Sequence, residues 1–255
     1  MNVQTETRSS GESTWSRALD VLLRYGGLLV IIVVFAYFAV QSPIFLTPDN
    51  VVAILTQSSV LAVAAFGAAT VMIGGGTHII KGGIDLSVGA QLGLVTAVYA
   101  LMLTNGWDPL IAIAVGVAVA LFLGLLNGLA VAVIGIIPLL ATLAMWRVVE
   151  GVEMLITNNV NVPVSSDFIS WIADGQVLFL PVPVVILLLS FAGYYLLVER
   201  TPLGYQIRAT GGNADAAIQA GINVRRYTIL TYVLASLAVA IASVIIIGRV
   251  SGSVR

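Results

Sequence analysis

Long apolar runs alternate with short polar stretches along the chain. We count about seven such runs, which cover residues 21–40, 51–80, 86–104, 110–134, 139–157, 177–198 and 227–247. Most of them match the roughly 20 residues that a helix needs to cross the hydrocarbon core of a membrane. In lipid, only helices and closed barrels satisfy every backbone polar group, and these runs are far longer than barrel strands. The pattern therefore predicts an all-α, polytopic transmembrane protein with about seven spans.

The second run contains more residues than one span requires. It covers residues 51–80, and its excess length coincides with three consecutive glycines, Gly74 to Gly76. We expect the helix to break or bend before Lys81, and the sequence G-G-I-D-L-S from Gly82 to turn the chain back.

Composition supports the same fold class. Charged residues make up 9% of the 255 residues and hydrophobic residues 59%, and the mean hydropathy is +1.06. Soluble domains carry about a quarter charged residues. The sequence therefore predicts a transmembrane domain over residues 21–255, surrounded by membrane lipid, after a disordered cytoplasmic tail over residues 1–20 that is rich in Ser, Thr and Glu.

The first apolar run has two interpretations. Arg17 precedes it and Arg24 lies near its start, as positive charge precedes the hydrophobic part of a signal peptide. No clear cleavage site closes it, and the chain re-enters the membrane soon afterwards. We therefore interpret this run as the first span.

Charge and rare residues exclude several functions. The net charge is −1, and so apolar a chain offers no continuous basic face, which argues against a nucleic-acid partner. The chain has no cysteine and one histidine, His78, which excludes disulfides, thiolate or histidine-rich metal sites and cysteine nucleophiles. The glycines from Gly74 are not a phosphate cradle, because no Lys-Ser/Thr pair follows them. We expect no metal, no cofactor and no catalytic residue, with His78 structural or interfacial.

The placement of the basic residues predicts an orientation. If the N-terminus is cytoplasmic, the three outer loops contain no Lys or Arg, whereas the inner segments contain Arg8, Arg17, Arg24, Lys81, Arg200, Arg208, Arg225 and Arg226. Positive residues favour the cytoplasmic side of short loops. We therefore expect a multi-pass protein of the cell (inner or plasma) membrane with a cytoplasmic N-terminus and a cytoplasmic loop over residues 199–226.

The longest polar interruption runs from Glu199 to Tyr232. Within it, Asn213 can cap a short helix over residues 214–220, with Asp215 near its positive end and Gly221 at its stop position. The spacing i, i+3, i+4, i+7 gives this helix one small apolar face, which consists of Ala214, Ala217, Ile218 and Gly221. Two helical turns are marginal alone in water, so we expect this face to lie in a partner's groove.

Three ordered blocks carry a family resemblance. They are G-G-I-D-L-S-V-G at residues 82–89, G-L-L-N-G-L-A-V-A-V-I-G-I-I-P-L-L-A-T-L at residues 124–143, and G-G-N-A-D-A-A-I-Q-A-G-I-N-V-R-R at residues 211–226. Together they resemble ATP-binding-cassette permeases that import monosaccharides, of the ribose, xylose and galactose type. The third block is similar to the cytoplasmic coupling segment of that family, and the first to its most characteristic motif.

The resemblance implies a transport subunit and not an enzyme. Two permease subunits, identical or different, would form the path, an extracytoplasmic sugar-binding protein would deliver the sugar, and a cytoplasmic ATPase subunit would drive transport. The implied coupling residues are Gly211, Gly212, Asn213, Ala214, Asp215, Ala217, Ile218, Gly221, Arg225 and Arg226. Family members usually have more helices and a further glycine-rich region after the position of Gly252. We therefore expect either that this chain is truncated at its C-terminus, as a fragment or a frame-shifted product, or that the span count is off by one.

Polar residues within the apolar runs are candidates for the sugar path. The family motif contributes Gly82, Gly83, Asp85 and Ser87, and the neighbouring runs contribute Gln91 and Asn127. Asp85 can cap the helix that begins near Leu86 or contact the solute. Neutral donors and acceptors suit hydroxyl groups, but hydrogen bonds between helices explain Ser87, Gln91 and Asn127 equally well.

One further face carries charge inside a predicted span. Arg147, Glu150 and Glu153 are spaced i, i+3 on one helix. An ion pair that fixes helix packing and a proton or ion relay are both consistent with this spacing, and Glu153 lies near enough to the outer surface to be solvated.

Other classes of function remain open from the sequence. An ion-coupled secondary transporter of a small polar solute is the main alternative, and its coupling site would have to use Asp85 or the Arg147 face. A retinal protein would need a lysine in the last run, which contains none. A purely structural membrane subunit is a third alternative.

Overall fold

The computed structural model describes residues 14–76, 82–164 and 166–250. It consists of two compact units, divided between Ala53 and Ile54. The elements are α1 (Thr14–Gln41), α2 (Pro48–Gly75), α3 (Val88–Thr104), α4 (Pro109–Leu129), the π-helix η1 (Ala130–Ile134), α5 (Pro138–Thr157), α6 (Asp167–Asp174), β1 (Gln176–Val177), β2 (Leu180–Pro181), α7 (Val182–Arg200), α8 (Pro202–Gly212), α9 (Ala214–Gln219) and α10 (Val224–Val250).

Each of the seven predicted spans corresponds to a helix, which confirms the all-α fold class. These helices are α1, α2, α3, α4 continued by η1, α5, α7 and α10. Within the described residues, α2, α4 with η1, α7 and α10 are long and apolar enough to cross a membrane. The apolar part of α1 and the whole of α3 are shorter, and α5 has 20 residues but carries three charges.

The first unit contains α1 and the turn after it. Phe45 in this turn lies 4.9 Å from the ring of Phe35 and 5.8 Å from that of Phe38, and its carbonyl oxygen accepts a hydrogen bond from the Asn50 amide at 2.8 Å. Helix α1 begins at Thr14, earlier than the predicted start at residue 21. Residues 1–13 of the predicted tail lie outside the described residues.

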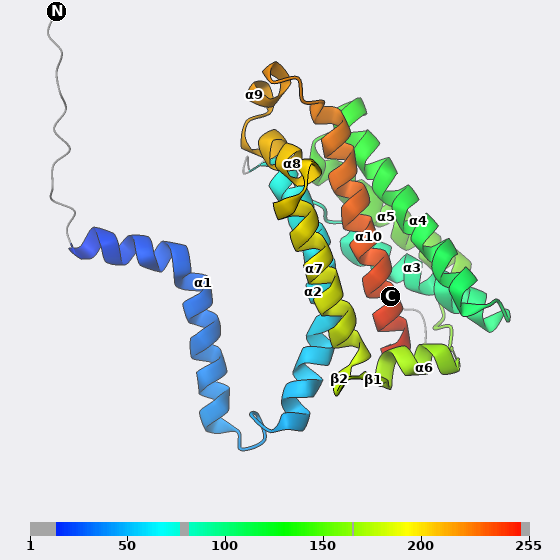
Figure 1. Cartoon of the computed structure of the whole chain (residues 1–255). Coiled ribbons are helices and arrows are strands. Elements are labelled where there is room, and N and C mark those ends of the chain that lie inside the picture. Colours follow the sequence, from blue (N-terminus) through cyan, green and yellow to red (C-terminus); the bar gives the residue numbers. More distant parts are fainter. Residues whose placement is uncertain (1–13, 77–81, 165, 251–255) are drawn as a thin grey trace, which may run out of the picture. The chain divides into compact units, whose positions relative to one another are not determined.

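In the second unit α10 is the central helix, in contact with α3, α4, α6 and α8 (Figure 1). Over half of its most apolar window, 56%, is buried. Small residues permit this close packing: Ala238 and Ala242 meet Val60 and Val63 of α2 in one core cluster. Because α10 holds the other helices together, residues far apart in sequence meet along its surface.

The two ends of the second unit differ. Figure 1 shows α8 and α9 at one end and α6 with the β1–β2 hairpin at the other. The hairpin was not predicted: β1 and β2 pair antiparallel, so α7 begins at Val182 instead of residue 177. Its turn residues, Leu178 and Phe179, have positive φ angles of 49° and 71°, a conformation for which turn sequences usually provide Asn or Gly.

The long second run ends at its glycines, as predicted. Helix α2 stops at Gly75, and Gly76 adopts a left-handed conformation with φ of 73°. His78 and Lys81, for which the sequence also made predictions, lie outside the described residues.

Candidate functional site: a buried polar cluster and a capped coupling helix

The motif segment from Gly82 to Ser87 is non-helical and passes directly against the end of α2. A Cβ atom on Gly83 would lie 1.8 Å from the carbonyl oxygen of Val71, and one on Gly75 would lie 2.2 Å from the Cα of Gly83. The segment can therefore approach this closely only because both positions are glycine.

Other helices satisfy the backbone of this segment. The Tyr232 hydroxyl of α10 donates to the carbonyl oxygen of Ile84 at 3.2 Å, and the backbone N–H of Leu86 donates to Thr142 Oγ1 of α5 at 3.1 Å. Irregular backbone at membrane depth is tolerated only where protein or a water-filled cavity surrounds it. The motif is thus anchored between α2, α5 and α10.

Asp85 does not cap α3 as predicted, because its carboxylate binds Ser87 before the helix begins. Its Oδ1 accepts from the backbone N–H of Ser87 at 2.9 Å and from the Ser87 hydroxyl at 2.5 Å. Helix α3 itself begins at Val88, two residues later than predicted, with Ser87 at the N-cap position. Asp85 therefore shapes the turn that leads into α3.

Ser87, Gln91 and Asn127 meet in one buried network. The Ser87 hydroxyl oxygen accepts from Gln91 Nε2 at 2.7 Å and from Asn127 Nδ2 at 2.8 Å, and Gln91 Oε1 accepts from the Ser236 hydroxyl at 2.7 Å. All four side chains are fully buried. The cluster links α3, α4 and α10 through hydrogen bonds between helices, and a role of these residues in the sugar path stays a prediction.

One acceptor in this cluster and one beside it retain hydrogen-bonding capacity. Asp85 Oδ2 and Asn127 Oδ1 are buried and have no hydrogen-bond partner among the described residues. Each can accept from a hydroxyl or amine donor. Ser236 is a cluster member that the sequence reasoning missed.

Replacing Ser87 by alanine should destabilise the protein more than an ordinary buried serine would. The change leaves Gln91 Nε2 and Asn127 Nδ2 without their common acceptor, and each buried unsatisfied group costs about 1–3 kcal/mol. We expect the free energy of unfolding in detergent to fall by at least about 2 kcal/mol. Ser243→Ala is the matched control, because Ser243 donates to carbonyl oxygens and accepts from no side chain in the described structure. Equal losses for the two variants would contradict the network's role.

The second candidate site, the predicted coupling segment, folds into two helices. Asn213 caps α9 as predicted, accepting from the backbone N–H of Ala216 at 3.0 Å. The chain leaves α9 in a Schellman motif: Gly221 has φ of 80°, its N–H donates to the Ile218 carbonyl, and that of Ile222 donates to the Ala217 carbonyl. Hydrogen bonds between residues close in sequence therefore define both ends of α9.

Two further caps in this segment were not predicted. Asn223 Oδ1 accepts from the backbone N–H of Arg226 at 3.1 Å at the start of α10. Thr201 caps α8, a helix that the sequence analysis did not predict, by accepting from the Gly204 N–H at 3.2 Å. The pair Thr201-Pro202 is a recognisable start signal for a helix.

The structure corrects the predicted partner-facing side of α9. Ala217 is only 4% exposed and Ile218 is 59% exposed, because α9 packs on α8 and α10. Ala217 is therefore part of this chain's own packing, and the face open to a partner contains Ile218 with the exposed residues Ala214 and Gly221.

The remaining coupling residues have distinct environments. Gly212 and Asp215 are exposed, whereas a Cβ atom on Gly211 would lie 1.8 Å from the Ile73 carbonyl oxygen. Gly211 thus brings the end of α8 against the end of α2, next to the motif segment. Arg225 and Arg226 are exposed at the start of α10. Arg208 binds within the chain, to Glu199 Oε1 at 2.8 Å.

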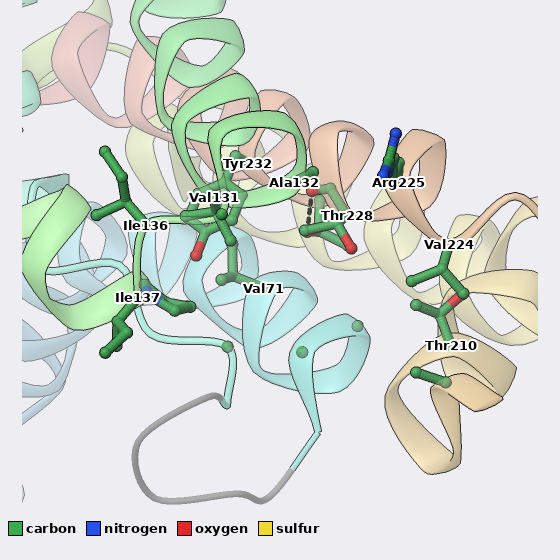
Figure 2. A pocket seen from close by; sticks show the side chains of 17 residues that line it. Val71, Val131, Ala132, Ile136, Ile137, Thr210, Val224, Arg225, Thr228 and Tyr232 are labelled. Carbon is green, nitrogen blue, oxygen red and sulfur yellow. Dashed lines mark hydrogen bonds between the residues drawn. The ribbon is translucent and has the colours of Figure 1, made fainter.

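A cavity of about 360 Å³ lies between the two candidate sites. Figure 2 shows Thr210, Val224 and Arg225 at one side of it and Val71, Val131 and Tyr232 at the other. Its volume lies within the range of small-molecule pockets, and Thr210, Thr228, Thr231 and Tyr232 are among the residues that line it. The cavity can therefore accommodate a small polar solute.

The charged residues of α5 differ in their exposure to solvent. Arg147 NH1 lies 2.9 Å from Glu150 Oε2, and these side chains are 74% and 35% exposed. The ion pair therefore lies on the outside of the described part of the second unit. Glu153 is 5% exposed, which corrects the expectation that it is solvated. Within the described residues, no group of three His, Cys, Asp or Glu side chains could hold a metal ion.

Comparison with known proteins identifies the family. The family model described as branched-chain amino acid transport system / permease component matches residues 50–253. The galactofuranose transporter permease protein YtfT of Escherichia coli (strain K12) is 38% identical over 200 residues, which are 78% of this chain and 57% of that protein. No solved structure matches the chain.

Two other relatives cover more of the chain. The ribose import permease protein RbsC of Bacillus subtilis (strain 168) is 34% identical over 231 residues, 90% of this chain and 70% of its own length. The D-allose transport system permease protein AlsC of Escherichia coli (strain K12) is 32% identical over 255 residues, 97% of this chain and 75% of its own length. The chain thus spans 57% of the galactofuranose permease and somewhat more of the other two.

These relatives confirm the resemblance that the three sequence blocks indicated. All three are named as permeases and none as an enzyme. Their names specify sugars, although the description of the matching family model specifies branched-chain amino acids. The chain is therefore a multi-pass membrane protein that belongs to the branched-chain amino acid transport system permease component family, within which its relatives here are sugar permeases.

Proposed function

We propose that this chain is the membrane-spanning permease subunit of an ATP-driven, binding-protein-dependent monosaccharide importer. The observation that carries the proposal is α9, a short helix capped at both ends that presents Ile218 to a partner at one end of the bundle. A cytoplasmic ATPase subunit would receive this helix in a groove. The chain itself would supply the path and perform no chemistry.

The contacts of the second unit suggest how α9 communicates with the spans. Helix α9 packs on α8 and α10, the end of α8 meets the end of α2 through Gly211 and Ile73, and the end of α2 meets the motif through Gly75 and Gly83. Because these are backbone contacts without intervening side chains, a displacement of α8 moves α2 and the motif segment directly. We propose that ATPase closure acts on the spans through this route.

The proposed partners follow from the proposed function as a permease subunit. They are a second permease subunit, a cytoplasmic ATP-binding-cassette ATPase, an extracytoplasmic sugar-binding protein and membrane lipid. A monosaccharide is the proposed solute because the relatives are named for ribose, galactofuranose and allose. The cavity beside α9 offers space for such a solute.

This proposal requires that α9 lies in the cytoplasm with the N-terminus. Single cysteines test the orientation cleanly, because the chain has none of its own. Cysteine at Asp167, exposed in α6, should react with an impermeant maleimide in intact cells. Cysteine at Arg226, exposed at the start of α10, should react only after the membrane is opened. The reverse labelling pattern would overturn the orientation.

ATP hydrolysis tests the proposed function as a whole. The permease expressed from its own gene is reconstituted with the ATPase and binding protein encoded beside it, and hydrolysis is measured with ribose, allose or galactofuranose. One of these sugars, with its binding protein, should stimulate hydrolysis. Hydrolysis that does not respond to any sugar or to the binding protein would contradict the proposal.

A further inference from the structure

We propose that a second copy of this chain docks on the face of α5 that carries Arg147 and Glu150. The inference rests on the proposed function in that it assigns a surface to the second permease subunit. It starts from a charged pair that the described part of this chain leaves uncovered at the centre of a membrane helix.

The depth of the pair follows from its position in α5. The helix extends from Pro138 to Thr157, so Arg147 is its tenth residue and Glu150 its thirteenth. At about 1.5 Å per residue, Arg147 lies roughly 14 Å along the helix from Pro138. The hydrocarbon core is about 30 Å thick. In the predicted span over residues 139–157, to which α5 corresponds, the pair therefore lies close to the middle of the membrane.

Lipid is an unfavourable neighbour for this pair. An arginine at the centre of a membrane helix costs at least about 2.5–3.5 kcal/mol, and 74% of the Arg147 side chain is exposed. The guanidinium group has five N–H donors, and the described structure gives it a single ion pair, to Glu150. Such a group requires protein or water beside it.

The surrounding face of α5 is shaped for a neighbouring helix. Its opposite side packs on α3, with Ala141 and Val149 buried. On the open side, Leu143 and Met154 are exposed, and no atom lies within 4 Å of the Cβ position of Gly151. A small residue beside a polar group permits close approach of another helix in a membrane.

The charge pattern favours a second copy as the neighbour. Two copies with the same orientation are related by a two-fold axis along the membrane normal, so equivalent residues lie at the same depth. Arg147 and Glu150 differ in depth by about 4.5 Å, which an arginine side chain spans. Arg147 of each copy can then reach Glu150 of the other. The two-fold axis therefore gives two equivalent ion pairs between the copies.

Helix α1 is a less suitable occupant of this face. Its apolar part, Tyr25–Gln41, contains no charged residue and could not complete the pairing of Arg147. A partner copy provides both charges at the required depth.

Complementary variants separate a pair between copies from a pair within one helix. Arg147→Glu gives a face with two acids, and Glu150→Arg gives a face with two bases, so each variant lacks the pair within its own helix. The two variants carry different tags and are expressed together. We expect homotypic co-purification to fall at least about tenfold below wild type, because like charges across an interface cost several kcal/mol. Heterotypic co-purification should recover toward the wild-type level. Equal homotypic and heterotypic recovery would overturn the proposal.

Cysteine crosslinking in an otherwise unchanged chain provides the second measurement. It tests the interface even where the charge variants do not accumulate in the membrane. Gly151→Cys should form covalent dimers under oxidation or with a short bis-maleimide. Leu189→Cys is the control, since Leu189 is also exposed in the middle of a span, on α7. Dimer yield at Gly151 no higher than at Leu189 would overturn the proposal. Neither readout requires transport, so failure here is distinguishable from failure of the proposed function.

Discussion

Gly83→Ala is expected to prevent stable folding of the permease. The added methyl group would lie 1.8 Å from the Val71 carbonyl oxygen and 3.0 Å from the Cα of Gly75. Both are backbone atoms, which cannot move aside as the end of a flexible side chain can. Overpacking of a well-packed core costs about 1–3 kcal/mol and occasionally more, and we expect a loss at the upper end, at least about 3 kcal/mol. The measurement is the yield and thermal stability of detergent-solubilised protein.

The same sequence motif supplies the control. Gly89 lies six residues later in the G-G-I-D-L-S-V-G block, and no atom lies within 4 Å of its Cβ position. Gly89→Ala should therefore leave yield and stability near those of wild type, or raise them slightly through improved helix propensity. Similar losses at Gly83 and Gly89 would show that the motif's glycines do not act through close packing against α2.

Ile218→Glu is expected to uncouple the ATPase from the permease while the spans remain folded. Ile218 is 59% exposed, so this chain's own packing does not depend on it. A glutamate buried without a partner costs several kcal/mol, and each 1.4 kcal/mol corresponds to about a tenfold loss of affinity. We expect co-purification of the ATPase subunit and sugar-stimulated ATP hydrolysis each to fall at least about tenfold.

Gln219→Glu is the matched control for this variant. Gln219 is the next residue of α9 and is also exposed, but it is already polar and lies outside the apolar face. Its replacement should leave ATPase binding near the wild-type level. If the two variants behave alike, α9 is not the coupling helix. Ala217→Glu would be a less informative test than Ile218→Glu, because a charge at this buried position would disturb packing on α8 and α10.

The sequence predicted the spans well because a membrane imposes one strong rule. Backbone groups in lipid must be satisfied within a helix or a closed barrel, so each apolar run had to become a helix. The same rule does not apply at the ends of the bundle. Helix α8 has few apolar residues and was missed, although Thr201 and Pro202 signalled its start. The β1–β2 turn was missed because Leu178 and Phe179 are not residues that favour positive φ.

In the candidate sites, the sequence likewise predicted features that depend on neighbouring residues and missed those that depend on tertiary packing. Asn213 and Gly221 could be assigned because a helix cap depends on residues close in sequence. The burial of Ala217 depends on α8 and α10, and no local pattern indicated which side of α9 would meet them. Ser236 is 145 residues from Gln91, its hydrogen-bond partner. Only the three-dimensional packing of α3 against α10 brings these two side chains together.

The most direct test of ATP-driven sugar import is uptake of labelled monosaccharide into membrane vesicles. The vesicles contain the permease expressed from its own gene and the ATPase and binding protein encoded beside it, with proton and sodium gradients clamped at zero. We predict that sugar accumulates when ATP is available to the ATPase and that accumulation stops when ATP is depleted. Uptake that persists without ATP and follows an imposed proton or sodium gradient would contradict this mechanism and identify an ion-coupled transporter instead.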